Sequence, residues 1–163
     1  MATKQSNLAL DRAHFNYVRQ HIPGYTPGYN RCIEWMLDLG IIQVSTAVEH
    51  AVAQQTGTRV ISEDARDLSD GSDVKTCTAR THNRGQSYGA PVTNIGGKTG
   101  SLRVQVYERL QDRFYLFLIP WEAYSHIPRS SNIEIPFESD GTPRRRNHWW
   151  QHEVRSWTSV PQI

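Results

Sequence analysis

The stretch Asp73-Val74-Lys75 has a spacing that suits metal-assisted hydrolysis. A metal nuclease needs carboxylates that converge on a divalent cation, and a positive side chain that orients water or balances charge in the transition state. Residues two apart on a β-strand project from the same face. A strand through this stretch therefore places a carboxylate beside an ammonium group and turns Val74 toward the opposite, buried face.

Several acids precede this stretch, and one of them can supply the second carboxylate. The Asp70-Gly71 dipeptide predicts a type I′ turn between two extended arms. With these two residues at the turn, Asp64 shares the face of Asp73 and Asp67 points away. A short loop in place of a regular hairpin instead favours Asp67, which lies closer to Asp73 along the chain. We favour Asp67 and keep Asp64 and Asp70 as alternatives.

Glu49 is a further candidate acid, in a stretch with a helical pattern. Ser45 or Thr46 can cap a helix that runs to about Gln55, before Gly57. Glu49 then lies in its first turn, either as the capping-box partner of Thr46 or as an acid directed at the site.

These residues resemble the PD-(D/E)xK superfamily, which comprises type II restriction endonucleases and their repair and homing relatives. The resemblance rests on Asp67 followed by Asp73-x-Lys75 and covers roughly residues 46–125, without the usual Pro-Asp dipeptide before the motif. It implies that Asp67 and Asp73 bind Mg²⁺, that Lys75 positions the attacking water, and that Glu49 adds a helix-borne acid. It also implies a restriction-endonuclease-like core and Mg²⁺-dependent, sequence-specific cleavage of double-stranded DNA.

The elements that must position these residues follow from hydrophobic periodicity. Helices are predicted over residues 8–21, 31–39 and 45–55, and strands over 58–61, 73–79, 101–109 and 113–120. The last strand is almost continuously apolar, as expected for a central strand covered on both faces. Helices followed by a strand meander predict an α+β fold, with a central mixed sheet of four or five strands flanked by helices. We expect one domain over residues 1–163, with a helical part (1–56), a catalytic sheet (57–125) and an Arg/Trp-rich tail (126–163).

The distribution of charge suggests a nucleic-acid partner. Residues 59–75 hold five acids against three bases, whereas residues 76–113 hold six bases against two acids. An acidic pocket flanked by basic surface suits a protein that holds a cation near a phosphate backbone. The candidate DNA contacts are Asn83, Arg84 and Gln86 in a predicted loop over 84–100 and just before it, Lys98 among glycines in the same loop, and Arg144, Arg145 and Arg146 in the tail.

The tail also carries two aromatic residues with two possible roles. Trp149 and Trp150 can stack on bases beside the arginines or cover the core. His148 and His152 have the spacing of half a zinc site, but no third ligand is evident in the sequence.

The remaining composition excludes other classes. With 37% hydrophobic and 21% charged residues, no apolar run long enough to cross a bilayer and no signal-peptide pattern, the chain is expected to be cytoplasmic. Lys98 lacks the context of a P-loop, so no nucleotide cofactor is expected. Cys32 and Cys77 show no metal-binding spacing and are expected to be buried thiols.

Cleavage of both DNA strands calls for two active sites, so a homodimer is expected, with the helices before Glu49 as the candidate contact. The alternative function is a non-catalytic DNA-binding or phage accessory protein, in which the acids form a surface turn.

Overall fold

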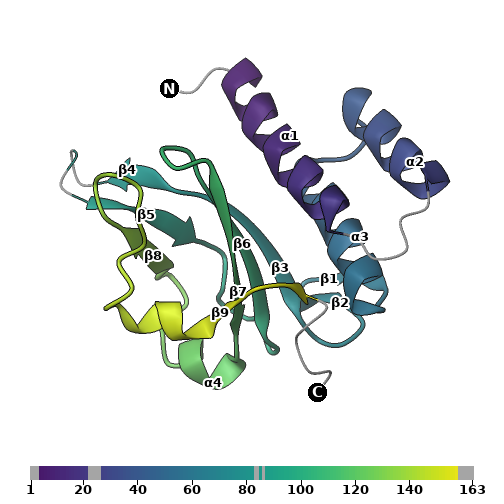
Figure 1. The fold of residues 1–163 in the computed structure, drawn as a ribbon. Coiled ribbons are helices and arrows are strands. Elements are labelled where there is room, and N and C mark those ends of the chain that lie inside the picture. Colours follow the sequence, from purple (N-terminus) through teal and green to yellow (C-terminus); the bar gives the residue numbers. More distant parts are fainter. Residues whose placement is uncertain (1–3, 22–26, 83–84, 86, 158–163) are drawn as a thin grey trace.

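The computed structural model describes residues 4–21, 27–82, 85 and 87–157. Three helices cover one face of a four-stranded sheet, and a three-stranded sheet covers the other face (Figure 1). This mixed α+β architecture, with helices packed on a mixed sheet, confirms the predicted fold class.

The helices are α1 (Lys4–Gln20), α2 (Pro27–Asp38) and α3 (Val44–Thr56). Phe15, Ile33 and Ala47, one from each helix, pack together in a small apolar cluster. The N-cap of α3 is Gln43, not Ser45 or Thr46. The predicted capping box is therefore wrong, because the helix begins earlier and Glu49 lies beyond its first turn. Among the described residues no helix is long and apolar enough to span a membrane.

The four-stranded sheet has the order β3 (Asp73–Thr78), β6 (Leu102–Glu108), β7 (Arg113–Ile119) and β9 (Glu153–Val154). β3 pairs with β6 in parallel, whereas the other two pairings are antiparallel. β3 is thus an edge strand. Between β3 and its partner β6, the chain passes through the three-stranded sheet.

The sheet separates two apolar cores. Phe117 and Ile119 of β7 pack toward the three-stranded sheet, and Leu116 packs toward the helices. The prediction that this strand is covered on both faces is confirmed. Cys77 is a buried free thiol whose pKa is raised to about 12 by burial, and the side chain of Cys32 lies outside the described residues.

The three-stranded sheet has the order β4 (Arg80–His82), β5 (Ser87–Val92) and β8 (Ile133–Phe137), with antiparallel pairing throughout. The loop predicted over 84–100 is therefore wrong in part, because β5 occupies its first half. Gly89 weakens the strand signal of β5 in the sequence. The pairing with β8 nevertheless requires glycine at this position, because a Cβ at Gly89 would lie 2.7 Å from Glu134 Oε1 and 2.9 Å from the Ile135 carbonyl oxygen.

β1 (Val60–Glu63) and β2 (Arg66–Leu68) form a separate antiparallel hairpin. The turn after it is closed by the Gly71 N–H bonding to the Leu68 carbonyl, so its central residues are Ser69 and Asp70. Gly71, which follows these two residues, takes a positive φ of 92°. The predicted type I′ turn is wrong, because the turn lies one residue earlier and neither Ser69 nor Asp70 takes the positive φ that this type requires. The hairpin register built on it is wrong too, because β3 pairs with β6 and not with β2.

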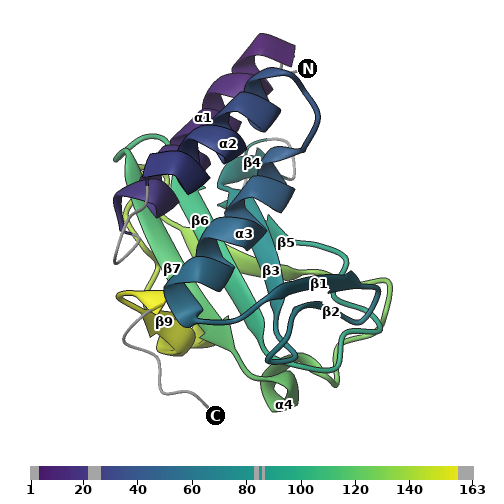
Figure 2. The same ribbon diagram turned by 90° about the vertical axis from the view of Figure 1, so that its right-hand side faces the viewer.

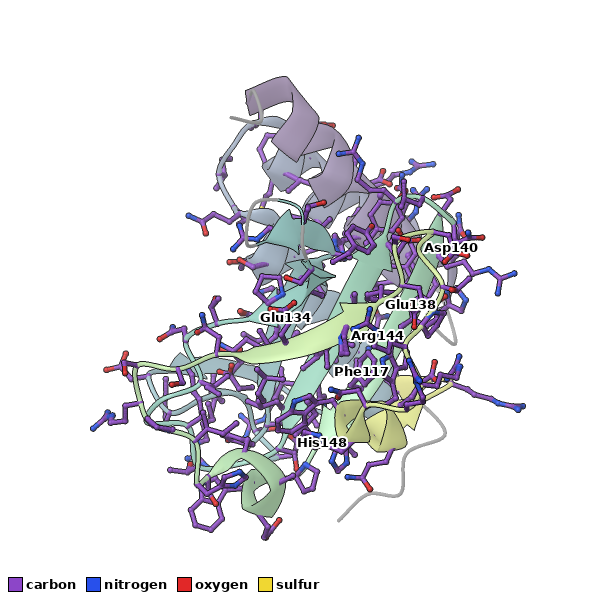
Figure 3. All side chains as sticks on the ribbon, turned by 90° about the vertical axis from the view of Figure 1, so that its left-hand side faces the viewer. Phe117, Glu134, Glu138, Asp140, Arg144 and His148 are labelled. Atoms are coloured by element: carbon purple, nitrogen blue, oxygen red, sulfur yellow. The ribbon has the colours of Figure 1, made fainter. Side chains whose placement is uncertain are left out.

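The tail contributes α4 (Trp121–Tyr124), β8, a 3-10 helix η2 (His148–His152) and β9. Trp149 and Trp150 are 8% and 5% exposed and belong to the core under the sheet. Of their two possible roles, the structure shows the covering of the core. Figure 3 shows Arg144 beside Glu138. These two side chains form an ion pair at 3.3 Å.

Candidate active site

Asp73 stands at the first position of β3 and is 1% exposed. Its N–H donates to the Ser101 carbonyl at 2.9 Å, which anchors the start of the β3–β6 pairing. Oδ2 lies 3.0 Å from Lys75 Nζ and Oδ1 lies 3.0 Å from Lys98 Nζ. Neither contact has regular hydrogen-bond geometry, so neither lysine satisfies the buried Asp73 oxygens with a hydrogen bond. Such a carboxylate retains the capacity to bind a cation.

Asp67 is fixed to the same strand by its side chain. Its Oδ2 accepts a hydrogen bond from the Val74 N–H at 2.8 Å. Since the Asp73 N–H points to β6, the next N–H points to the free edge of β3, and Asp67 covers that edge. Burial raises the pKa of Asp67, as do the charge of Asp73 and a side-chain hydrogen bond with it, whereas the Val74 hydrogen bond acts in the opposite direction. Two carboxylates that interact in this way repel each other when both are charged, and a nearby cation reduces that repulsion.

The other two candidate acids face elsewhere. Asp64 is exposed, and only its backbone carbonyl takes part, as acceptor of a hydrogen bond from Lys98 Nζ at 2.7 Å. Asp70 accepts hydrogen bonds from Ser72 and forms an ion pair with Arg103 at 2.8 Å. These bonds hold the pKa of Asp70 below its usual value against the effect of burial. Asp70 therefore fixes the turn before β3.

Glu49 approaches the pair of aspartates from α3. In Figure 2, α3 crosses in front of the sheet, and β1 and β2 lie beside the start of β3. Burial and the charges of Asp67 and Asp73 raise the pKa of Glu49, whereas Lys75 and Lys98 oppose the rise, with a net pKa of about 7. A carboxyl group with a pKa near neutrality can accept or release a proton under physiological conditions.

The two lysines that contact Asp73 differ in the elements that carry them. Lys75 is a β3 residue whose Nζ also donates to the Asn94 carbonyl at 3.0 Å. Lys98 lies in the loop between β5 and β6, which contains Gly96, Gly97 and Gly100. The sequence assigned Lys98 to phosphate contact, whereas the structure brings it to Asp73. No short-range pattern predicts this, because the contact joins distant parts of the chain.

Gly100 and Tyr124 hold the loop before β6 against the turn before β3. A Cβ at Gly100 would lie 1.9 Å from the Gly71 carbonyl oxygen, so the loop before β6 packs directly on the turn before β3. The Tyr124 hydroxyl donates to the Gly100 carbonyl at 2.6 Å. Burial raises the pKa of Tyr124 to about 12, and the charge of Asp73 adds to the effect. Tyr124 was missed from the sequence, since its short helix gives no periodic signal.

The remaining predicted DNA contacts lie in the segment after β4 and in the tail. Asn83, Arg84 and Gln86 lie outside the described residues. Arg144 pairs with Glu138, and Arg145 pairs with Glu153 at 2.5 Å while its guanidinium lies over Trp150. Arg146 is exposed.

Arg129 is a basic residue near the site that sequence reasoning did not single out. It lies against the glycines of the Lys98 loop, where a Cβ at Gly97 would be 3.0 Å from its guanidinium. Its side chain gives the rim of the site a positive charge.

The donor set can be tested against the expected Mg²⁺. Within the described ranges no group of three or more His, Cys, Asp and Glu side chains is arranged to hold a metal ion. Mg²⁺ is commonly held by only one or two carboxylates and keeps several waters. The paired carboxylates of Asp67 and Asp73, with the unsatisfied oxygens of Asp73, fit that mode of binding.

Comparison with models of protein families, with curated proteins and with solved structures found no match to this chain.

Proposed function

We propose that the protein is a Mg²⁺-dependent endonuclease that hydrolyses phosphodiester bonds in double-stranded DNA, with the sequence-specific cleavage of a restriction enzyme. The observation that carries the proposal is the attachment of Asp67 to the start of the edge strand β3, where Lys75 Nζ lies 3.0 Å from Asp73. Glu49 on α3 is close enough for the charges of these residues to act on its pKa. These are the residue types that metal-assisted phosphodiester hydrolysis requires.

Each residue has a distinct task in this proposal. Asp67 and Asp73 would hold the ion, which when bound activates water and offsets charge on the phosphate. Lys75 projects from the same face of β3 as Asp73, so its ammonium can orient water and stabilise negative charge on the phosphoryl oxygens. Glu49, with its pKa near 7, can take the proton from the attacking water.

The position of the site on an edge strand supports a large substrate. β3 has β6 on one side only, and Asp67 covers part of its free edge through Val74. Arg129, on the rim near Gly97, can pair with a phosphate beside the scissile one. The homodimer remains part of the proposal, because a two-fold pair of such sites is needed to cut both strands of a symmetric sequence.

The test is cleavage of varied plasmid and genomic DNA with Mg²⁺, with Mn²⁺ and with a chelator. Wild type should cut with either ion and stop with the chelator, and Asp73→Asn and Lys75→Ala should lose cleavage while keeping the wild-type circular dichroism spectrum. Glu138→Gln, a change at an exposed ion pair outside the cluster, is the matched control. Binding without cleavage under all conditions would instead indicate the DNA-binding accessory protein.

A further inference from the structure

Lys98 places its ammonium group beside the carboxylate of Asp73. Its Nζ lies 3.0 Å from Asp73 Oδ1 and 2.7 Å from the Asp64 carbonyl oxygen, and its side chain is 10% exposed. The adjacent carboxylates of Asp67 and Asp73 repel each other, and an ammonium between the hairpin and β3 reduces that repulsion. Lys98 thus provides the positive charge that the acid pair requires in the absence of a metal ion.

The attachment of Lys98 differs from that of Lys75. Lys75 belongs to the β3–β6 ladder, opposite Val104, and its side chain shares a face with Asp73 because of its position in the strand. Lys98 instead extends from a loop in which Gly97 takes a φ of 83°. A long, flexible lysine side chain on such a loop can leave the carboxylate without any change in the sheet.

A divalent ion and an ammonium cannot both approach the same carboxylate oxygen closely, because their charges repel. The ion needs Asp73 as a ligand, and the backbone of Lys75 is fixed beside Asp73 by the β3–β6 ladder, whereas Lys98 extends from a loop. Lys98 is therefore the group that must yield. Once released, its ammonium can bind a phosphate group of the substrate near the ion.

We propose that Lys98 is a resident counter-ion which the divalent cation displaces from Asp73, and which then binds a phosphate group of the DNA. This inference rests on the proposed function. It predicts competition between Lys98 and the metal ion, which a permanent structural ion pair would not show.

The test is Mn²⁺ binding to the full-length protein without DNA, measured by electron paramagnetic resonance of the free ion. Lys98→Met should bind Mn²⁺ about tenfold more tightly than wild type, because the competing charge is gone. Arg144→Met, which removes an equal charge at an exposed ion pair, should change the affinity less than about twofold, since solvent and salt screen distant charges. Despite tighter metal binding, Lys98→Met should cut DNA more slowly at saturating Mn²⁺.

A second measurement needs no variant with altered stability. The chain has three lysines, Lys4, Lys75 and Lys98, so lysine-specific ¹³C labelling gives a simple spectrum. Addition of Mg²⁺ should move the Lys98 Cε signal to the position and narrow line width of an exposed lysine, while the Lys75 signal stays that of an immobilised side chain.

The outcomes separate the two proposals. Equal or weaker Mn²⁺ binding by Lys98→Met, or an immobile Lys98 signal in saturating Mg²⁺, would overturn the counter-ion role while metal-dependent cleavage by wild type still stood. Absence of metal binding and of cleavage in wild type would overturn the nuclease and this inference together.

Discussion

The Val74 N–H donates to Asp67 Oδ2 at 2.8 Å, which fixes one acid to the strand that carries the other. Because β3 is an edge strand, this N–H has no partner within its sheet, and the carboxylate satisfies it. The bond orients Asp67 beside Asp73 and resolves in structural terms which upstream acid lies with Asp73 and Lys75.

The three upstream acids should therefore respond differently to replacement by asparagine. Asp67→Asn should lower the cleavage rate at least about 100-fold, because loss of a metal ligand removes several kcal/mol of charge stabilisation. Asp64→Asn should cut normally, since its exposed side chain is not in the cluster. Single-turnover rates of the three variants test this ranking, and normal cleavage by Asp67→Asn would refute it.

Asp70→Asn should affect stability instead of catalysis. Asp70 pairs with Arg103, which is 8% exposed, so the change leaves a buried guanidinium without its counter-ion. We expect a loss of about 2 kcal/mol in the free energy of unfolding, reduced from that of a fully buried pair because Asp70 is partly exposed. Urea denaturation measures the loss, and the folded variant should cut DNA at nearly the wild-type rate.

Lys75→Met should slow the chemical step about 10²- to 10⁴-fold, the usual effect of removing a positioned catalytic group. Mn²⁺ affinity should not fall and should increase, since the change removes a positive charge next to Asp73 and leaves both carboxylates in place. Rapid-quench cleavage and Mn²⁺ titration of the same sample separate the two effects. A variant that loses metal binding and keeps its rate would contradict the role assigned to Lys75.

Glu49→Gln should stabilise the metal-free protein at alkaline pH. The pKa of Glu49 is raised from 4.5 to about 7 in the folded state. The unfolded chain therefore releases this proton first, and wild-type stability falls as pH rises from about 4.5 through 7. Thermal melting in the presence of a chelator should give Glu49→Gln the higher midpoint at pH 8 and a smaller difference at pH 5. With Mg²⁺, its cleavage rate should be lower than that of wild type at pH 8, and the difference should shrink at pH 5, where Glu49 is mostly protonated.

His14 should make the protein sensitive to acid for the opposite reason. This side chain is buried between Thr78 and Gln105, and burial lowers its pKa from 6.5 to about 4. The unfolded chain therefore binds a proton at His14 more readily than the folded protein does. The free energy of unfolding is then highest above pH 6.5 and falls toward pH 4. Between pH 7 and 4, wild type should lose about 3 kcal/mol more than His14→Gln. Equal losses by urea denaturation would show that His14 is not buried as a neutral imidazole.

Local patterns were sufficient for the elements that carry Glu49, Asp73 and Lys75, but not for β2, which carries Asp67. The period of the three helices and the alternation over residues 73–79 predicted α1, α2, α3 and β3, and the apolar run over 113–120 predicted β7 as a central strand. The spacing of Asp73 and Lys75 predicted their shared side of β3, since that follows from strand geometry alone.

Features that depend on contacts between distant segments were not predictable in this way. β5 and β8 contain Gly89, Pro91 and Pro136, which weaken a strand signal, and their pairing becomes favourable only when they pack on the main sheet. The approach of Lys98 to Asp73 and of Gly100 to Gly71 likewise requires the parallel β3–β6 pairing, which no local spacing encodes.

That parallel pairing has a consequence for the order in which the protein is made. β6 follows β3 only after β4 and β5 have been synthesised, and its own other neighbour, β7, comes later still. A nascent chain on the ribosome that ends before β6 has no neighbour for β3 in the four-stranded sheet and no anchor for the Asp73 N–H. Non-local strand pairing of this kind forms late in folding. The cluster around Asp73 can thus assemble only after translation has passed β6.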